Sequence, residues 1–164
     1  MILSPAEQEF IFSDLDKNYN FIHVTTKPAA LGIMSKGFYF EDPLYKTADL
    51  VTGNSGWLDF WWQQRKFYGD HIILISISKA LFEYCATISK YELDNRVNTF
   101  QLLNSSIILH TIDGEAQLTL GQHFIKGYIN RKEKTINKNP SFDPTVFKHA
   151  EANIKKYKEI LLKP

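Results

Sequence analysis

Apolar and polar positions follow two different periods along the chain, and the change of period places the predicted elements. Helical spacing of three to four residues occurs early, in residues 4–14 and 26–37, and again at the end, in residues 145–163. Strand-like alternation and short apolar runs lie between them, most clearly in HIILISIS at residues 71–78. The pattern therefore predicts helices concentrated near the two ends and short strands between them, which is an α+β arrangement.

The stretch NFIHVTTKPAALGIMSKGFYF, residues 20–40, predicts a strand, a capped helix and a second extended segment. Aromatic and β-branched residues surround His23 and favour the strand. Thr26 is placed to cap the helix, Pro28 falls in its first turn, and Gly37 is placed to end it. We expect His23 to lie close to the point where this strand gives way to the helix.

The remaining pattern predicts further short elements. They are a helix at 57–67, a buried strand at 71–78, a short helix or turn at 79–82, a strand within 104–111 centred on 107–109, and strands at 115–120 and 123–130. In the helix at 57–67, Trp57, Phe60 and Trp61 share one face, and Trp62 points elsewhere. Asp113-Gly114 is a hairpin signal. Residues 84–99 have a weak pattern that predicts loop with strand pieces, and residues 131–144 predict a mobile or wrapping loop. We expect one domain over residues 1–164, closed by a helix at 145–163.

Composition narrows the function classes. The net charge is +1, which predicts no strong overall attraction to nucleic acid or membrane, although residues 131–164 carry nine Lys or Arg against four acids. Cys85 is the single cysteine, so no internal disulfide forms, which fits a reducing cytosol. No apolar run reaches the roughly 18–20 residues that span a bilayer, and a secretory leader is not expected.

Four features occur in an order that is typical of one enzyme superfamily. They are His23 with Thr25 at the end of a strand, Tyr45 in LYKT, the aromatic segment WLDFWWQQRKF, and Glu115 after a hairpin turn. This order resembles the ADP-ribosyltransferase superfamily, in its His-Tyr-Glu branch. The resemblance covers residues 20 to about 130. It implies a split, mostly antiparallel sheet with flanking helices, and NAD as the substrate.

The resemblance also implies a role for each matched residue. His23 would hydrogen-bond the ribose on the adenosine side, with backbone groups near Thr25 holding the nicotinamide amide. Tyr45 would stack on the nicotinamide ring, and Trp57 or Trp61 would supply the second ring. A cationic ring is held well between electron-rich aromatic faces. Each residue has an ordinary structural interpretation as well, in the core or on the surface.

Glu115 would be the catalytic residue, because a carboxylate stabilises the positive charge that develops on the ribose as the glycosidic bond breaks. A second position could correspond to the catalytic residue. Arginine-modifying relatives carry Glu-x-Glu with the second Glu catalytic, and this chain has Glu115-Ala116-Gln117. An equivalence with Gln117 would leave a neutral amide in the site and no activity. We prefer Glu115, since the His-Tyr-Glu branch uses a single Glu.

Other chemistries find less support in the sequence. Cys85 has no Gly-rich turn or nearby base of the kind that a Cys-His hydrolase needs. The five histidines lack metal-ligand spacing, so no metal site is expected. No Gly-rich phosphate loop is present.

The expected function is therefore transfer of ADP-ribose from NAD to a macromolecular acceptor, which is a protein, DNA or RNA. A short chain of this composition suits a bacterial toxin or effector, delivered by a specialised secretion route and acting in a reducing cytosol. A cognate inhibitor protein is a further expected partner, and no membrane is expected. The alternative is a non-catalytic module with the same fold that uses its basic C-terminal helix against a protein or nucleic acid. NAD affinity separates the two.

Overall fold

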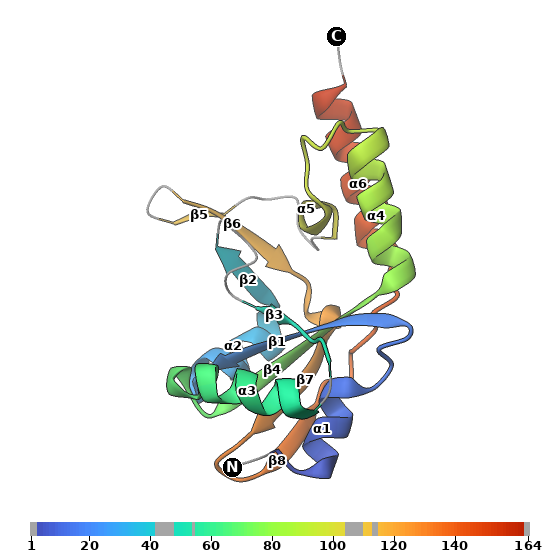
Figure 1. Ribbon diagram of the computed structural model, residues 1–164. Coiled ribbons are helices and arrows are strands. Elements are labelled where there is room, and N and C mark those ends of the chain that lie inside the picture. Colours follow the sequence, from blue (N-terminus) through green and yellow to red (C-terminus); the bar gives the residue numbers. More distant parts are fainter. Residues whose placement is uncertain (1–2, 42–47, 54, 104–109, 113–114, 163–164) are drawn as a thin grey trace.

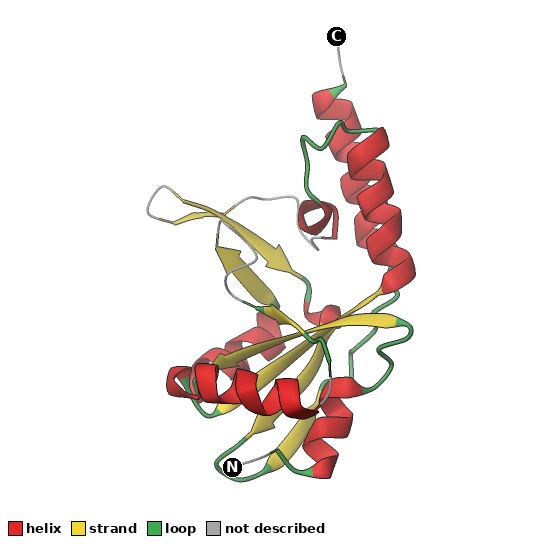
Figure 2. Cartoon of the chain, in the orientation of Figure 1, coloured by secondary structure: helices red, strands yellow, loops and turns green. Residues whose placement is uncertain are grey.

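A computed structural model describes residues 3–41, 48–53, 55–103, 110–112 and 115–162 of the chain. These residues form an α+β fold with two antiparallel sheets and helices packed around them (Figures 1 and 2). The α+β class predicted from the periodicity is confirmed.

The larger sheet has five strands in the order β3-β1-β4-β7-β8. Their bounds are β1 (Asn18–Thr25), β3 (Asp49–Leu50), β4 (His71–Ser78), β7 (Ile125–Asn130) and β8 (Thr135–Lys138). Every residue of β4 is buried, because this central strand is covered on both faces. The apolar run of residues 72–75, followed by Ile77, is the sequence signature of that position, and the predicted bounds of the strand are confirmed.

The smaller sheet has three strands in the order β2-β6-β5. Its strands are β2 (Phe38–Glu41), β5 (His110–Ile112) and β6 (Glu115–Leu120), and β6 pairs antiparallel with both neighbours. The expected antiparallel pair around the Asp113-Gly114 signal is present, with Ile112 opposite Glu115. Figure 1 shows this pair reaching away from the larger sheet.

One face of the larger sheet is covered by α1 (Pro5–Phe12) and α3 (Ser55–Arg65), which runs into the 3₁₀ turn η2 (Lys66–Tyr68). The predicted first helix is confirmed, and Ser4 and Glu7 form a reciprocal capping box at its start. The core on this side joins both helices to β1, β4 and β7. Glu7 lies buried against Arg131, whose guanidinium pairs with its carboxylate.

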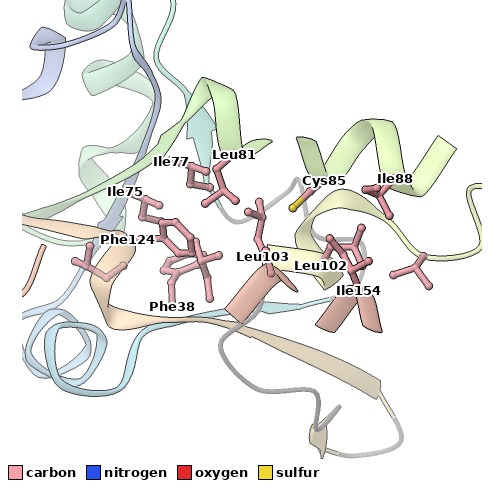
Figure 3. Packing of buried hydrophobic residues seen from close by; sticks show 14 of the residues in the cluster. Phe38, Ile75, Ile77, Leu81, Cys85, Ile88, Leu102, Leu103, Phe124 and Ile154 are labelled. Atoms are coloured by element: carbon pink, nitrogen blue, oxygen red, sulfur yellow. The ribbon is translucent and has the colours of Figure 1, made fainter. Parts of the chain in front are cut away.

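The other face is covered by α2 (Lys27–Lys36), the 3₁₀ turn η3 (Gln122–Phe124), and the helices α4 (Lys79–Tyr91), α5 (Thr99–Leu103) and α6 (Lys148–Leu161). Their apolar side chains make one continuous core with β4, β2 and β6 (Figure 3). In this cluster α4 contributes Cys85, α6 contributes Ile154, and the smaller sheet contributes Phe38. The predicted C-terminal helix is confirmed.

Two predictions between these elements are wrong. Residues 84–99, expected as loop with strand pieces, contain most of α4 and the start of α5. Leu81, Cys85 and Ile88 lie on the buried side of α4, so its apolar residues do follow helical spacing. Aromatic and β-branched neighbours, which have lower helix propensity, obscure that spacing in the sequence. Residues 131–144, expected as a mobile or wrapping loop, contain β8, which pairs with β7 at the edge of the sheet.

The aromatic helix has a different buried face from the one we expected. The helix itself is confirmed as α3, but Ser55 is its first residue rather than its cap. Leu58, Trp61 and Trp62 are buried, whereas the side chain of Phe60 is 66% exposed. Trp62 therefore faces the core and Phe60 faces solvent, the reverse of the sequence-based prediction, because the sheet contacts the side of α3 next to the expected one.

Gly37 ends α2 as predicted, for a reason that the sequence pattern does not reveal. Its φ is 93°, and a Cβ atom there would lie 2.2 Å from the carbonyl oxygen of Leu120. The absence of a side chain at Gly37 therefore allows the end of α2 to approach β6 closely. Thr26 occupies the expected N-cap position, but its side chain makes no capping hydrogen bond.

Candidate functional site

His23 lies where the two sheets meet. It sits in β1 opposite Ile73 of β4, and its ring is partly exposed. Its ring centroid lies 4.9 Å from that of Phe38 at an interplanar angle of 76°, which is an edge-to-face contact. Phe38 is the first residue of β2 and thus belongs to the smaller sheet. The predicted strand-end histidine is therefore positioned by both sheets.

Thr25 is the last residue of β1 and lies opposite His71 of β4. Gly69 packs against its backbone: the φ of Gly69 is 152°, and a Cβ atom there would lie 2.0 Å from the Thr25 carbonyl oxygen. The strand end that carries His23 and Thr25 is thus held in place by a glycine two residues before β4.

His71 is a buried histidine that the sequence analysis did not assign. Its Nδ1 lies 2.6 Å from Oδ1 of Asp70, and its side chain is only 3% exposed. Its Nε2 is buried and meets no hydrogen-bond partner among the described residues. The ring of Tyr128 lies against it, with centroids 5.4 Å apart. His71 is therefore a buried neighbour of Thr25 within the larger sheet.

Asp49 ties the edge of the larger sheet to α3. It lies in β3 opposite Ile22 and accepts a hydrogen bond of 2.9 Å from Nε1 of Trp61. Arg65 donates to the same carboxylate from Nε at 3.0 Å and from Nη2 at 3.2 Å. The side chain of Asp49 is 34% exposed. The sequence alone gave no signal for Asp49, because its partners lie 12 and 16 residues further along the chain.

The Asp49 carboxylate is held in its charged form. Burial opposes its ionisation, but the hydrogen bonds from Arg65 and Trp61 outweigh burial. The positive charge of Arg65 and the field of His23 act in the same direction, so the pKa of Asp49 falls below its usual value. The site therefore holds an ion pair of Asp49 with Arg65 beside β1.

Of the two tryptophans proposed for the nicotinamide slot, Trp57 is the accessible one. Trp61 is 5% exposed and its Nε1 is bonded to Asp49, whereas Trp57 is partly exposed. The two rings are stacked, with centroids 6.4 Å apart and an interplanar angle of 23°. Trp61 thus supports Trp57 from the core side, and Trp57 is the better candidate to meet a ligand ring.

Tyr45 lies outside the described residues, and for Glu115 and Gln117 the structure describes the backbone alone. Glu115 is the first residue of β6, and Leu120 of the same strand lies opposite Phe38. Five residues of strand span roughly 16 Å. A ligand that contacts both His23 and Glu115 would therefore have to be extended.

Cys85 is not a nucleophile in this fold. It lies in α4 with no exposed surface, and burial raises the pKa of its thiol to about 12. Among the described residues, no cluster of three or more His, Cys, Asp or Glu side chains is arranged to hold a metal ion.

Comparison with known proteins adds no relative. No family model, no curated protein and no solved structure matches the chain. Within the described part of the chain, none of the helices has the length and apolar character to cross a membrane.

Proposed function

We propose that the chain is an NAD-dependent ADP-ribosyltransferase that transfers ADP-ribose to a macromolecular acceptor and releases nicotinamide. The observation that carries this proposal is the junction of a five-stranded and a three-stranded antiparallel sheet at the contact of His23 with Phe38. Two such sheets, with the histidine in β1 at their junction, fit the split-sheet fold that the ordered motifs resemble. The proposal assigns the chain to the ADP-ribosyltransferase-like fold on this basis.

NAD would lie along the junction of the sheets. His23 and the strand end at Thr25 would hold one part of the dinucleotide, and the accessible ring of Trp57 would stack on the nicotinamide together with Tyr45. An extended dinucleotide suits the separation of roughly 16 Å between the two ends of β6. Asp49 and Arg65 would keep the helix that carries Trp57 against the sheet.

The proposed reaction breaks the bond between the nicotinamide nitrogen and the ribose carbon C1′. The bonding electron pair leaves with nicotinamide, which becomes neutral, and positive charge develops on the ribose. The carboxylate of Glu115 would hold the ribose 2′-hydroxyl and stabilise that charge. A nucleophile of the acceptor then forms a bond to C1′ and loses its proton, for which Glu115 is the proposed base.

The decisive experiment measures NAD affinity and nicotinamide release by purified protein, with Glu115→Gln as the test variant. We expect Glu115→Gln to bind NAD with nearly unchanged affinity and to lose on the order of 10²–10³ in rate, because the carboxylate acts on charge that appears only as the bond breaks. Glu133→Gln, an exposed glutamate in the turn between β7 and β8, is the matched control. Release by Glu115→Gln at the wild-type rate would refute the site.

His23→Ala separates binding from chemistry. Its proposed contacts exist already in the NAD complex, so we expect a higher KM for NAD with a smaller change in kcat. Gln117→Glu tests the alternative assignment, in which position 117 corresponds to the catalytic Glu. If this substitution creates activity in a protein that otherwise binds NAD without turning it over, position 117 and not 115 is the catalytic one.

The rival function is a non-catalytic module that binds a partner through α6. Its support is the exposed lysines of that helix, Lys148, Lys155 and Lys156. A folded protein with no measurable NAD affinity would favour this rival. Within the first proposal, a bacterial toxin or effector acting in a reducing cytosol remains the proposed setting, with a cognate inhibitor protein as a further partner.

A further inference from the structure

Three large aromatic side chains are exposed on α3 and on the turn η2 that follows it. The exposed fractions are 66% for Phe60, 81% for Phe67 and 65% for Tyr68, and we call these three residues the aromatic patch. An aromatic side chain has about 150–250 Å² of surface, so these fractions leave roughly 300–500 Å² of aromatic surface in water. Exposed apolar surface on this scale marks an interaction site.

The patch belongs to the side of α3 that faces away from the larger sheet (Figure 1). The turn η2 continues α3 without a break. Phe60 and Phe67 are thus about two helical turns apart and share one face. Gln63 and Gln64 lie between them in the chain, and both are exposed. The outer side of α3 therefore carries an aromatic ring at each end and two amides in the middle.

One acid and one base accompany the two rings. Asp59 precedes Phe60 and Lys66 precedes Phe67, so the same spacing places both charges on one flank of the exposed face. Within the part of the chain that the structure describes, Asp59 has no ion-pair partner. Lys66 donates from Nζ to the neutral Oε1 of Gln63 at 2.8 Å. The flank is therefore negative at one end and positive at the other, and neither charge is neutralised.

This arrangement is complementary to a reversed copy of itself. A twofold axis that passes between Gln63 and Gln64 would relate two antiparallel α3 helices and keep the charged flank on the same side of both. Phe60 of each copy would then face Phe67 of the other, and Asp59 of each would lie beside Lys66 of the other. A parallel alignment would put like charges side by side instead, so the charges select the antiparallel one.

We propose that the chain forms a twofold-symmetric homodimer through the aromatic patch, with antiparallel α3 helices and Asp59–Lys66 ion pairs between the copies. The rings supply the apolar contact, and the charges set the direction of pairing. The aromatic surface of one copy is about half of the roughly 800 Å² per partner in a standard interface, so the dimer dissociates readily. None of these groups belongs to the proposed NAD site, and the proposal does not rest on it.

Sedimentation equilibrium of the full chain over concentrations from about 1 µM to 1 mM tests for the dimer. We expect the average mass to rise from 19.0 kDa toward twice that value. Phe60→Ser combined with Phe67→Ser should weaken dimerisation at least about tenfold, because each copy loses both rings. Leu31→Ser is the matched control: Leu31 is 47% exposed on α2, across the sheet from α3, and its loss should stay within about twofold.

Charge reversal tests the direction of pairing. Asp59→Lys and Lys66→Glu should each weaken the dimer about fivefold or more, because each turns two attractive pairs into repulsive ones. The protein carrying both substitutions should dimerise like wild type, and a mixture of the two single variants should form a heterodimer tighter than either homodimer. Circular dichroism verifies that each variant is folded. Single variants that weaken dimerisation without recovery in the double variant would overturn the antiparallel arrangement.

Three outcomes would overturn the dimer altogether. The first is a mass that stays at 19.0 kDa throughout the concentration range. The second is dimerisation that none of the α3 variants changes, since the interface would then lie elsewhere. The third is a monomer that sediments with phosphatidylglycerol vesicles and loses this binding in Phe60→Ser with Phe67→Ser, which would assign the aromatic patch to a lipid surface instead.

Discussion

The indole Nε1 of Trp61 donates a hydrogen bond of 2.9 Å to Oδ2 of Asp49, joining α3 to the two-residue edge strand β3. Arg65 donates to both oxygens of the same carboxylate. One side chain thus fixes the helix that carries Trp57 to the strand beside β1.

Removing this carboxylate should loosen the helix. We expect Asp49→Ala to lower the free energy of unfolding by about 1–3 kcal/mol, since charged hydrogen bonds are lost from a group that is one-third exposed. Asp49→Asn keeps an acceptor for Trp61 and should cost less. Urea unfolding measures both, and Asp59→Asn on the same helix is the charge-matched control. Equal stability of Asp49→Ala and wild type would show that the hydrogen bonds do not hold α3.

The accessible ring of Trp57 gives an optical test of the nicotinamide slot. We expect NAD to quench part of the tryptophan fluorescence of wild type and of Trp62→Phe, whose ring is buried. Trp57→Phe should lose most of that quenching and weaken NAD binding modestly, because a smaller ring still stacks. Unchanged quenching in Trp57→Phe would place the ligand ring elsewhere.

Substituting alanine for Gly69 or for Gly32 should change the stability of the fold in opposite directions. At Gly69 a Cβ atom would collide with the backbone of Thr25, so Gly69→Ala should destabilise the fold by about 1–3 kcal/mol. At Gly32, inside α2, a Cβ atom would meet nothing within 4 Å, and Gly32→Ala should stabilise by about 0.5–1 kcal/mol. Chemical denaturation compares them. The same sign for both substitutions would contradict the close approach at Thr25.

His123 makes the stability of the fold sensitive to acid. Burial, reinforced by the neighbouring His149 and opposed by Asp143, lowers its pKa to about 4 from an ordinary 6.5. The unfolded chain therefore takes up the proton first, and this contribution to stability is present above pH 6.5 and lost as the pH falls toward 4. Its Nε2 is buried without a partner among the described residues, and its ring stacks on that of His149 at 5.2 Å.

We expect wild type to lose about 1–2 kcal/mol of unfolding free energy between pH 7 and pH 5 through this group. His123→Gln should lose less over the same interval, and His149→Gln should fall between them because the neighbouring charge is removed. Urea unfolding at the two pH values measures the difference. A pH dependence that is identical in His123→Gln and wild type would assign the acid sensitivity to other groups.

The sequence predicted elements well where one physical signal dominated. The apolar run of β4 requires burial on both faces, and the Ser4 and Glu7 pair is a local capping signal, so both elements were placed correctly. The short helix or turn predicted at 79–82 is the start of α4, but the loop predicted at 84–99 is wrong, because Phe82, Tyr84 and Ile88 weaken the helical propensity of α4. Tertiary contacts with α5 and α6 supply what the local sequence lacks.

The candidate site was less predictable, for a topological reason. His23 could be placed at a strand end from its neighbours, but its contact with Phe38 depends on how two sheets meet. Asp49 was missed because its partners lie on a helix that reaches it only in the folded chain. The buried face of α3 was misassigned for the same reason: periodicity defines a set of faces, and packing selects one of them.

The direct passage of β4 into α4, with no residue between Ser78 and Lys79, has a mechanical consequence. The helical layer of α4, α5 and α6 shares one core with the strand that runs through the middle of the larger sheet. A force or a proteolytic cut that peels α6 away uncovers Leu102, Cys85 and, through them, the side of β4 itself. The helices that stand out from the sheets in Figure 1 thus belong to the main core of the fold. We expect them to unfold together with the larger sheet.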